Sequence, residues 1–213
     1  MATIMKGILG GFSGKVGTVV GFNWRGKDVI RSRPKPSSKP PTDKQKLQQM
    51  KFKLVVGFLQ PLKSVQQLFF GTRSGVKSRV NQAVAYTINE AVEVINDLPE
   101  LVYNKVLITR GDLAGFQNVA LTNQTGGVLS LSWEDNSIQG NASDTDLVNL
   151  VCYCPETETF ELFLLLAQRS DLTATVTLPD VYVGKTVETW AYFNNQDQEK
   201  ACNSPYLGTF TIT

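Results

Sequence analysis

The most regular alternation of hydrophobic and polar positions lies near the N-terminus, at residues 16–24, VGTVVGFNW. β-Branched and aromatic side chains occupy every second position there, which is the period of a β-strand. Residues 25–27, RGK, predict a turn, and residues 28–33 predict a returning strand. We therefore expect an N-terminal β-hairpin in which the glycines have a structural role.

The pattern is lost at residues 33–41, RPKPSSKPP, which contain four prolines and three basic residues. Proline at this density excludes a helix or a central strand and predicts an extended, polyproline-like connector. Such a connector is either a solvated linker or an arm that lies across a neighbouring subunit or along a polyanion.

Two helical stretches are predicted after the connector. Thr42-Asp43 provides an N-terminal cap, and apolar residues then recur three and four positions apart as far as Phe70. Pro61 lies inside this stretch and predicts either a kink or a junction between two helices. A second apolar stripe extends over residues 76–98 and ends at Pro99, so we expect a helical hairpin.

From about residue 101 the pattern changes to short apolar runs separated by Asn, Asp, Gly and Pro. The spacing of these runs is typical of an all-β sandwich. The expected fold class is therefore α+β, with a basic N-terminal region at residues 1–101 and a β-sandwich at residues 102–213. The predicted strands are Lys105–Thr109, Val128–Trp133, Leu147–Cys154, Phe160–Ala167, Thr173–Leu178, Thr186–Phe193 and Leu207–Thr211.

Charge is divided unevenly along the chain, although its net value is only +2. Residues 1–80 hold 16 Lys and Arg against two acids, a net charge of +14, and residues 81–213 hold five against 17, a net charge of −12. This asymmetry indicates a basic surface that meets either nucleic acid or an acidic protein face. We expect the contact to be made by Arg25, Lys27, Arg31, Arg33, Lys35 and Lys39.

The sequence offers little catalytic chemistry. It contains no histidine, which removes the commonest general base and metal ligand. Neither a P-loop nor a G-x-G-x-x-G pattern occurs among the N-terminal glycines. Three cysteines, at positions 152, 154 and 202, predict buried structural thiols. We expect no enzymatic activity, no cofactor, no metal and no small-molecule substrate.

Two further groups of residues are expected to be structural. The acidic pairs 134/135, 144/146 and 156/158 fall in or beside predicted turns, where solvated carboxylates are typical. Arg110-Gly111-Asp112 spells an adhesion tripeptide, but Gly and Asp are also turn residues, and we expect a turn. No apolar run is long enough to span a bilayer and no signal peptide is evident, so a cytoplasmic or virion location is expected.

Two resemblances add to this picture. VLSLSWED at residues 128–135 and ETWAYFNNQDQ at residues 188–198 resemble the second and sixth strands of fibronectin type III domains, with Tyr192 at a common aromatic position. The N-terminal glycine–valine hairpin with its RS-x-P turn, followed by PTDKQKLQQMKFKL, resembles a family of uncharacterised proteins of Bacteroidota. The second resemblance extends over the whole chain and implies no activity.

These observations lead to two expected functions. The first is a non-enzymatic structural subunit that assembles with copies of itself, for example into a phage particle or filament. The second is a non-specific nucleic-acid-binding protein that uses the same basic region to contact phosphates. No helix-turn-helix, zinc finger or ribonucleoprotein motif is present, so sequence-specific recognition is not expected.

Overall fold

The computed structural model describes residues 3–4, 11–24, 26–35, 40–72 and 77–213. The chain divides into two compact units, residues 1–43 and residues 44–213. The helices therefore lie in the same compact unit as the strands that follow them. The division at residue 101, as a statement about independently folding domains, stays a prediction.

The first unit contains an antiparallel sheet with the strand order β1-β2-β3-β4. Its strands are β1 (Thr3–Ile4), β2 (Phe12–Val16), β3 (Val19–Trp24) and β4 (Lys27–Ser32). The single strand predicted over residues 16–24 is interrupted, because a two-residue turn at Gly17-Thr18 separates β2 from β3. Gly17 has a φ of 52°, a conformation that glycine adopts without steric cost. The predicted hairpin of β3 and β4 is present, and Arg25 in its turn lies outside the described residues.

The second unit contains the expected immunoglobulin/fibronectin-like β-sandwich. One sheet has the order β11-β8-β7 and the other has the order β10-β9-β12-β13. Their seven strands are β7 (Gln117–Gln124), β8 (Val128–Glu134), β9 (Leu147–Cys154), β10 (Thr159–Gln168), β11 (Thr173–Thr177), β12 (Thr186–Asn194) and β13 (Tyr206–Thr211). Short 3-10 helices η2 (Arg169–Asp171) and η3 (Asp180–Tyr182) flank β11.

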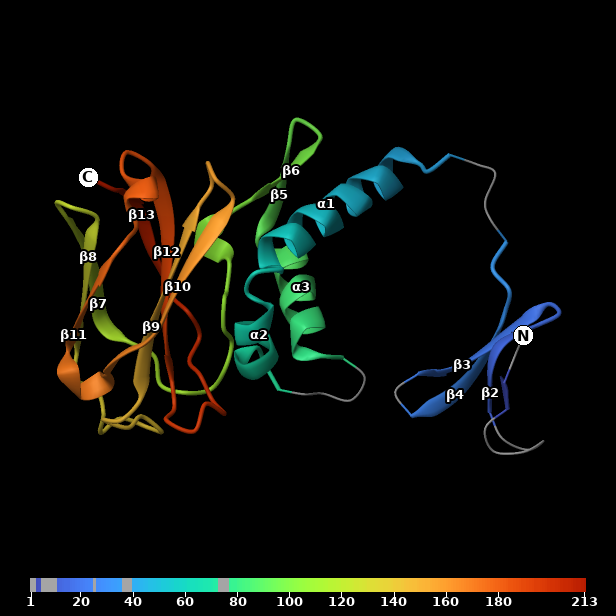
Figure 1. The fold of residues 1–213 in the computed structure, drawn as a ribbon, viewed down its shortest axis with the longest axis horizontal. Helices are drawn as coiled ribbons and strands as arrows, with labels where there is room; N and C mark the ends of the chain where they lie inside the picture. The colour runs from blue at the N-terminus through green and yellow to red at the C-terminus, as the bar shows by residue number, and fades with distance from the viewer. Residues whose placement is uncertain (1–2, 5–10, 25, 36–39, 73–76) are drawn as a thin grey trace. The chain divides into compact units, whose positions relative to one another are not determined.

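Three helices cover the outer face of the four-stranded sheet (Figure 1). They are α1 (Asp43–Leu59), α2 (Lys63–Phe69) and α3 (Arg79–Glu90). Pro61 marks the junction between α1 and α2, which was one of the two predicted outcomes. The rings of Phe58 and Tyr153 meet edge to face with centroids 4.9 Å apart, and those of Phe69 and Tyr192 lie 5.9 Å apart.

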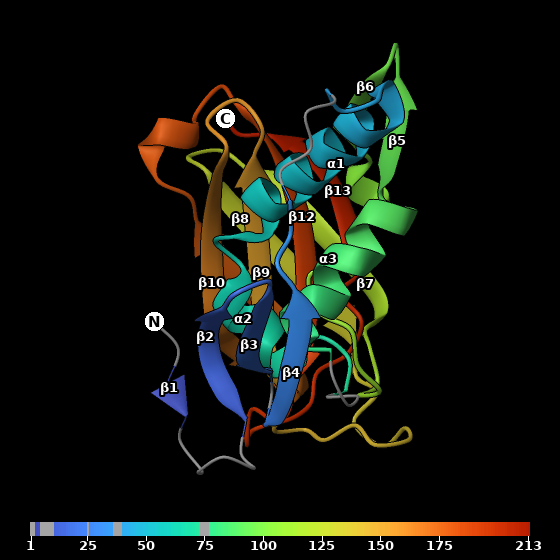
Figure 2. The same cartoon turned by 90° about the vertical axis from the view of Figure 1, so that its right-hand side faces the viewer.

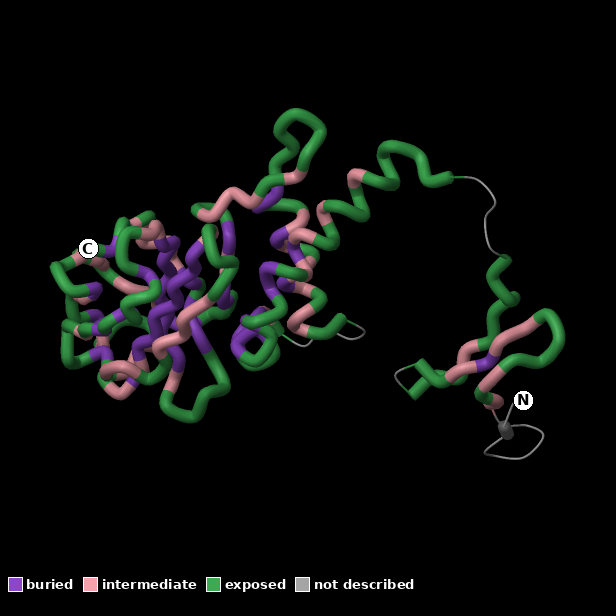
Figure 3. The backbone as a smooth tube through the Cα atoms, turned by 45° about the horizontal axis from the view of Figure 1, so that its top comes forward, coloured by how far each residue is buried: buried purple, intermediate pink, exposed green. Residues whose placement is uncertain are grey.

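The central strands β9 and β12 are buried on both faces, by the helices on one side and by the second sheet on the other (Figure 3). Alternate residues of β12 divide between these layers. Tyr192 packs against the helices, whereas Phe193 stacks on Phe116 in the sandwich core at a centroid distance of 4.0 Å. This explains why β9 is apolar at nearly every position and why β12 contains an unbroken apolar run at residues 190–193 instead of an alternating pattern.

The second predicted helix is wrong over residues 91–98. The chain leaves α3 at Glu90 and forms a hairpin of β5 (Val92–Ile95) and β6 (Leu98–Leu101). Asn96 and Asp97 have positive φ values of 50° and 63°, the conformation of a type I′ turn, for which Asn and Asp are favoured residues. The same apolar positions that fit a helical stripe also fit two short strands around this turn.

The predicted strand at Lys105–Thr109 is also absent, and a 3-10 helix, η1 (Tyr103–Lys105), precedes an irregular buried segment. The backbone N–H groups of Ile108 and Thr109 donate to Ser204 Oγ at 2.8 and 3.2 Å instead of joining a strand ladder. Conversely, the first strand of the sandwich, β7, was not predicted, because its sequence QNVALTNQ is mostly polar.

Candidate interaction surface

Cross-strand register places basic and aromatic side chains on one face of the N-terminal sheet. Residues directly opposite each other in adjacent antiparallel strands share a face. Val20 lies opposite Arg31, Phe22 opposite Val29, and Trp24 opposite Lys27. The third strand of this face contributes Lys15, which lies opposite Val20. We call this set the basic face: Lys15, Val20, Phe22, Trp24, Lys27, Val29 and Arg31.

The basic face presents both charge and apolar area. Lys15, Lys27 and Arg31 are exposed, and Trp24 retains 45% of its accessible area. The Arg31 guanidinium lies 5.4 Å from the centroid of the Phe22 ring, within the range of a cation–π contact. An arrangement of this kind contacts anionic groups through its cations and apolar or planar groups through its rings.

In the described part of the first unit, the opposite face of the sheet does not supply a core. Ile30 is 63% exposed and Val16 is 50% exposed. Gly21 is the one buried residue among the described residues of this unit, and a side chain there would meet the carbonyl oxygen of Phe12 at 2.3 Å. Figure 3 shows the contrast with the strongly buried strands of the sandwich. Small sheets need a packed hydrophobic face for stability, so this one is suited to burying area against a partner.

The structure describes four of the six predicted contact residues. Lys27 and Arg31 share the basic face, as the alternation of β4 requires. Arg33 and Lys35 follow β4 and are exposed, and the Arg33 N–H donates to the Thr18 carbonyl at 2.7 Å. Arg25 and Lys39 lie outside the described residues. Sequence reasoning did not select Lys15. A two-residue turn at 17–18 pairs Lys15 with Val20 and so places it on this face, but that turn was not recognised from the sequence.

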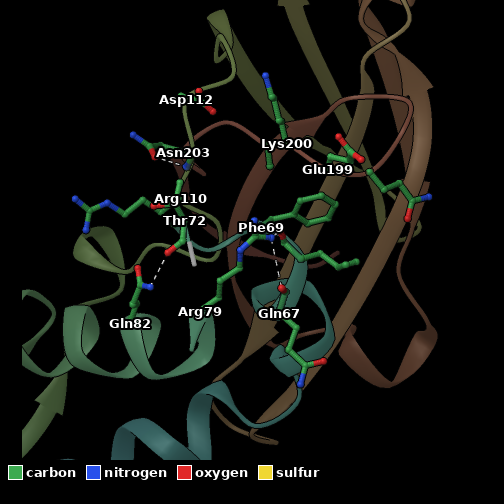
Figure 4. A pocket seen from close by; sticks show the side chains of 15 residues that line it. Gln67, Phe69, Thr72, Arg79, Gln82, Arg110, Asp112, Glu199, Lys200 and Asn203 are labelled. Atoms are coloured by element: carbon green, nitrogen blue, oxygen red, sulfur yellow. Dashed lines mark hydrogen bonds between the residues drawn. The ribbon is translucent and has the colours of Figure 1, made fainter. Parts of the chain in front are cut away.

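A second candidate is a cavity of about 920 Å³ in the second unit. Most of the residues that line it have polar side chains, and two of these side chains form hydrogen bonds within the protein. The Gln82 side-chain amide donates to the Thr72 carbonyl at 2.8 Å, and Arg79 donates to the carbonyl of Leu68. Figure 4 shows that the charged ends of Arg110 and Lys200 point away from each other. Among the described residues that line the cavity, these two cations therefore do not converge on one ligand position.

The adhesion-like tripeptide borders this cavity, and its central glycine is required by packing. A Cβ at Gly111 would lie 2.1 Å from the Ala201 carbonyl oxygen. The Gly111 N–H donates to Asn203 Oδ1 at 3.1 Å. The backbone of the tripeptide is thus fixed against the segment that follows β12, and Arg110 lies over the Tyr86 ring at 5.6 Å.

One of the acidic residues expected to be solvated is instead buried. Asp146 is 1% exposed, and its Oδ2 accepts from the Arg169 guanidinium at 3.0 and 3.1 Å. The prediction for Asp146 was wrong because its ion-pair partner lies 23 residues away, beyond the reach of a local pattern. Within the described ranges, no group of three or more His, Cys, Asp or Glu residues is placed to hold a metal ion.

The three cysteines are free and buried, as predicted. Burial raises the pKa of Cys152 to about 12 and that of Cys202 to about 11. Both groups therefore remain protonated thiols at neutral pH, and they are poor nucleophiles in the folded protein. In the described part of the chain, no helix has the length and apolar character needed to cross a membrane.

The fold and its exposed basic sheet define an α+β protein with a fibronectin-like sandwich. The chain belongs to a family of unknown function (DUF6266), whose model matches residues 11–208. Among solved structures, it is similar to an fn3 domain of the human collagen alpha-1(XX) chain, with 17% identity and a TM-score of 0.33, covering 47% of this chain and 85% of that one. No curated protein matches the chain.

Proposed function

We propose that this protein is a non-enzymatic structural subunit that assembles with copies of itself, as a component of a phage particle or filament. The observation that carries the proposal is the basic face on a sheet that has one buried residue, Gly21, among the residues whose burial is described. A sheet of this kind gains stability by covering its apolar side chains with another surface.

The distribution of charge along the chain favours a second copy of the same chain as the surface that covers the basic face. Residues 1–43 hold eight Lys and Arg against two acids, whereas residues 81–213 carry the net charge of −12. Contact between a basic patch and a different, acidic patch is heterologous, so each copy uses one surface of each kind. Heterologous contacts repeat into rings or open filaments, which are the forms expected of a structural subunit.

The non-enzymatic part of the proposal is supported by the composition. The chain has no histidine, and its cysteine thiols are buried and protonated. The buried carboxylate of Asp146 is occupied by Arg169 in a contact that joins loops of the sandwich. Packing in the folded protein accounts for the burial of these thiols and of this carboxylate.

The proposal is tested by size-exclusion chromatography with light scattering on nuclease-treated protein. The full chain is expected to form defined oligomers, and removal of residues 1–41 is expected to leave monomers. The truncation keeps the compact second unit and the Thr42-Asp43 start of α1. Monomers of the full chain at all concentrations would contradict assembly.

A second candidate function is non-specific nucleic-acid binding. It is favoured by the exposed Trp24 ring and the Phe22 ring beside three cations, since aromatic stacking combined with phosphate neutralisation is how single strands are bound. Salt weakens both contacts and does not separate them. The same chromatography does: a monomer that becomes large only after DNA or RNA is added back supports this second function and contradicts the first.

A further inference from the structure

The β5–β6 hairpin extends away from the sandwich (Figures 1 and 2). Apolar side chains near its tip are exposed. Ile95 and Leu98 lie opposite each other next to the turn and are 45% and 58% exposed. Val94, on the other face, is 40% exposed. The base of the hairpin is anchored by Val92, which is 8% exposed. Only the outer part of the hairpin is therefore available to a partner.

Carboxylates border this tip. Glu93 lies directly opposite Glu100, on the same face as Ile95 and Leu98, and Asp97 lies in the turn. Like charges at directly opposed positions destabilise a hairpin. Lys105 offsets part of this repulsion through an ion pair with Glu93 at 2.6 Å, whereas Glu100 has no ion pair within the described part of the chain. A basic partner would relieve the remaining repulsion.

The basic face has the complementary pattern. Its apolar centre, Phe22 and Val29, is bordered by the cations Lys27 and Arg31, as the apolar tip of the hairpin is bordered by Glu93 and Glu100. Both surfaces are parts of small β-structures that leave apolar side chains exposed. Opposite charge sets the register of such a contact, and burial of the apolar centres stabilises it.

We propose that the β5–β6 hairpin of one copy docks on the basic face of a second copy. This inference rests on the proposed function and specifies which surfaces meet. Because the two surfaces differ, the contact is heterologous, and each copy offers one hairpin and one basic face to its neighbours.

Cross-linking between two single-cysteine variants tests the contact. One chain carries Leu98→Cys, the other carries Val29→Cys, and different tags distinguish the mixed product by size. The native thiols are buried, so the introduced ones react selectively under mild oxidation. Each chain carries one introduced thiol, so the mixed product reports only contacts between copies.

The matched control replaces Val29→Cys by Ile30→Cys, the next residue of β4, which lies on the opposite face. The proposal predicts a mixed disulfide for Leu98→Cys with Val29→Cys in clear excess over the control pair. Equal yields for the two pairs, or no mixed product at concentrations where the full chain is oligomeric, would overturn the docking. A chain that is monomeric throughout would overturn the proposed function itself.

Charge exchange provides an independent readout. Arg31→Glu and Glu100→Lys each place like charges across the contact and are expected to weaken association about tenfold or more. An equimolar mixture of the two variants restores opposite charge at each contact between unlike variants, so assembly in which the two alternate is expected to be regained. Oligomers that withstand both single changes, while still requiring residues 1–41, would contradict the hairpin as the partner and leave self-assembly standing.

Discussion

Arg169 is fully buried, and its guanidinium joins three loops of the sandwich. It donates to Asp146 Oδ2, to the Asn136 side-chain oxygen, and to the backbone carbonyls of Ala114 and Gly115 at 2.8 and 3.3 Å. It also lies 3.8 Å from the centroid of the Phe193 ring. The charge is therefore compensated only while Asp146 remains in place.

Asp146→Ala is expected to destabilise the fold by about 3–5 kcal/mol, because it leaves the Arg169 charge buried without its carboxylate. Urea unfolding monitored by tryptophan fluorescence measures the change. Asp144→Ala, at an exposed position two residues earlier, is the control and is expected to change stability by less than about 1 kcal/mol. Similar losses for both variants would show that the ion pair is not the cause.

Gly111 is a second position where a single substitution is expected to change the stability of the fold. Gly111→Ala forces the new Cβ against the Ala201 carbonyl oxygen, and a loss of about 1–3 kcal/mol is expected from the backbone shift. Gly115→Ala is the matched control, since a Cβ there meets nothing within 4 Å. Thermal unfolding of the two variants compares them directly. A Gly111→Ala variant as stable as the control would contradict the packing argument.

At the scale of elements, the sequence predicted the helices and strands whose local hydrophobic pattern matches the burial of their residues in the fold. Six of the seven predicted strands from residue 105 onward are present, because each is a short run of strand-favouring residues bounded by turn residues, a pattern that can be recognised locally. The strand β7 was missed because its polar edge position leaves no apolar pattern. The segment 91–98 was assigned to a helix because its apolar spacing fits both periods, and the Asn96-Asp97 turn decides between them.

Helix α1 offers a prediction at this scale. Gly57 is exposed within the helix, and a Cβ there meets nothing within 4 Å. Gly57→Ala is expected to stabilise the protein by up to about 1 kcal/mol, because alanine loses less conformational freedom in a helix. Gly184, with a φ of 78°, is the contrasting position, where alanine is expected to destabilise. Thermal denaturation of both variants measures whether each substitution raises or lowers the stability. A loss of stability for Gly57→Ala would contradict the account of this helix.

At the scale of the whole molecule, the sequence revealed the charge asymmetry but not the surfaces that carry it. Alternation along β4 was enough to place Lys27 and Arg31 on one face. The β5–β6 hairpin was hidden, because residues 91–98 were expected to be helical. Glu93 then appears as an ordinary helix-surface charge, and Glu100 lies beyond the predicted end of the helix at Pro99. The two carboxylates lie directly opposite each other only because the chain reverses at Asn96-Asp97.

Self-association of the intact chain is the central claim, and sedimentation velocity of nuclease-treated protein over a wide concentration range tests it most directly. The account predicts a weight-average sedimentation coefficient that rises with concentration. A much flatter dependence is expected for Arg31→Glu, because the new carboxylate repels the acidic hairpin. A single coefficient at the value of a 23.5 kDa monomer across the whole range would contradict it.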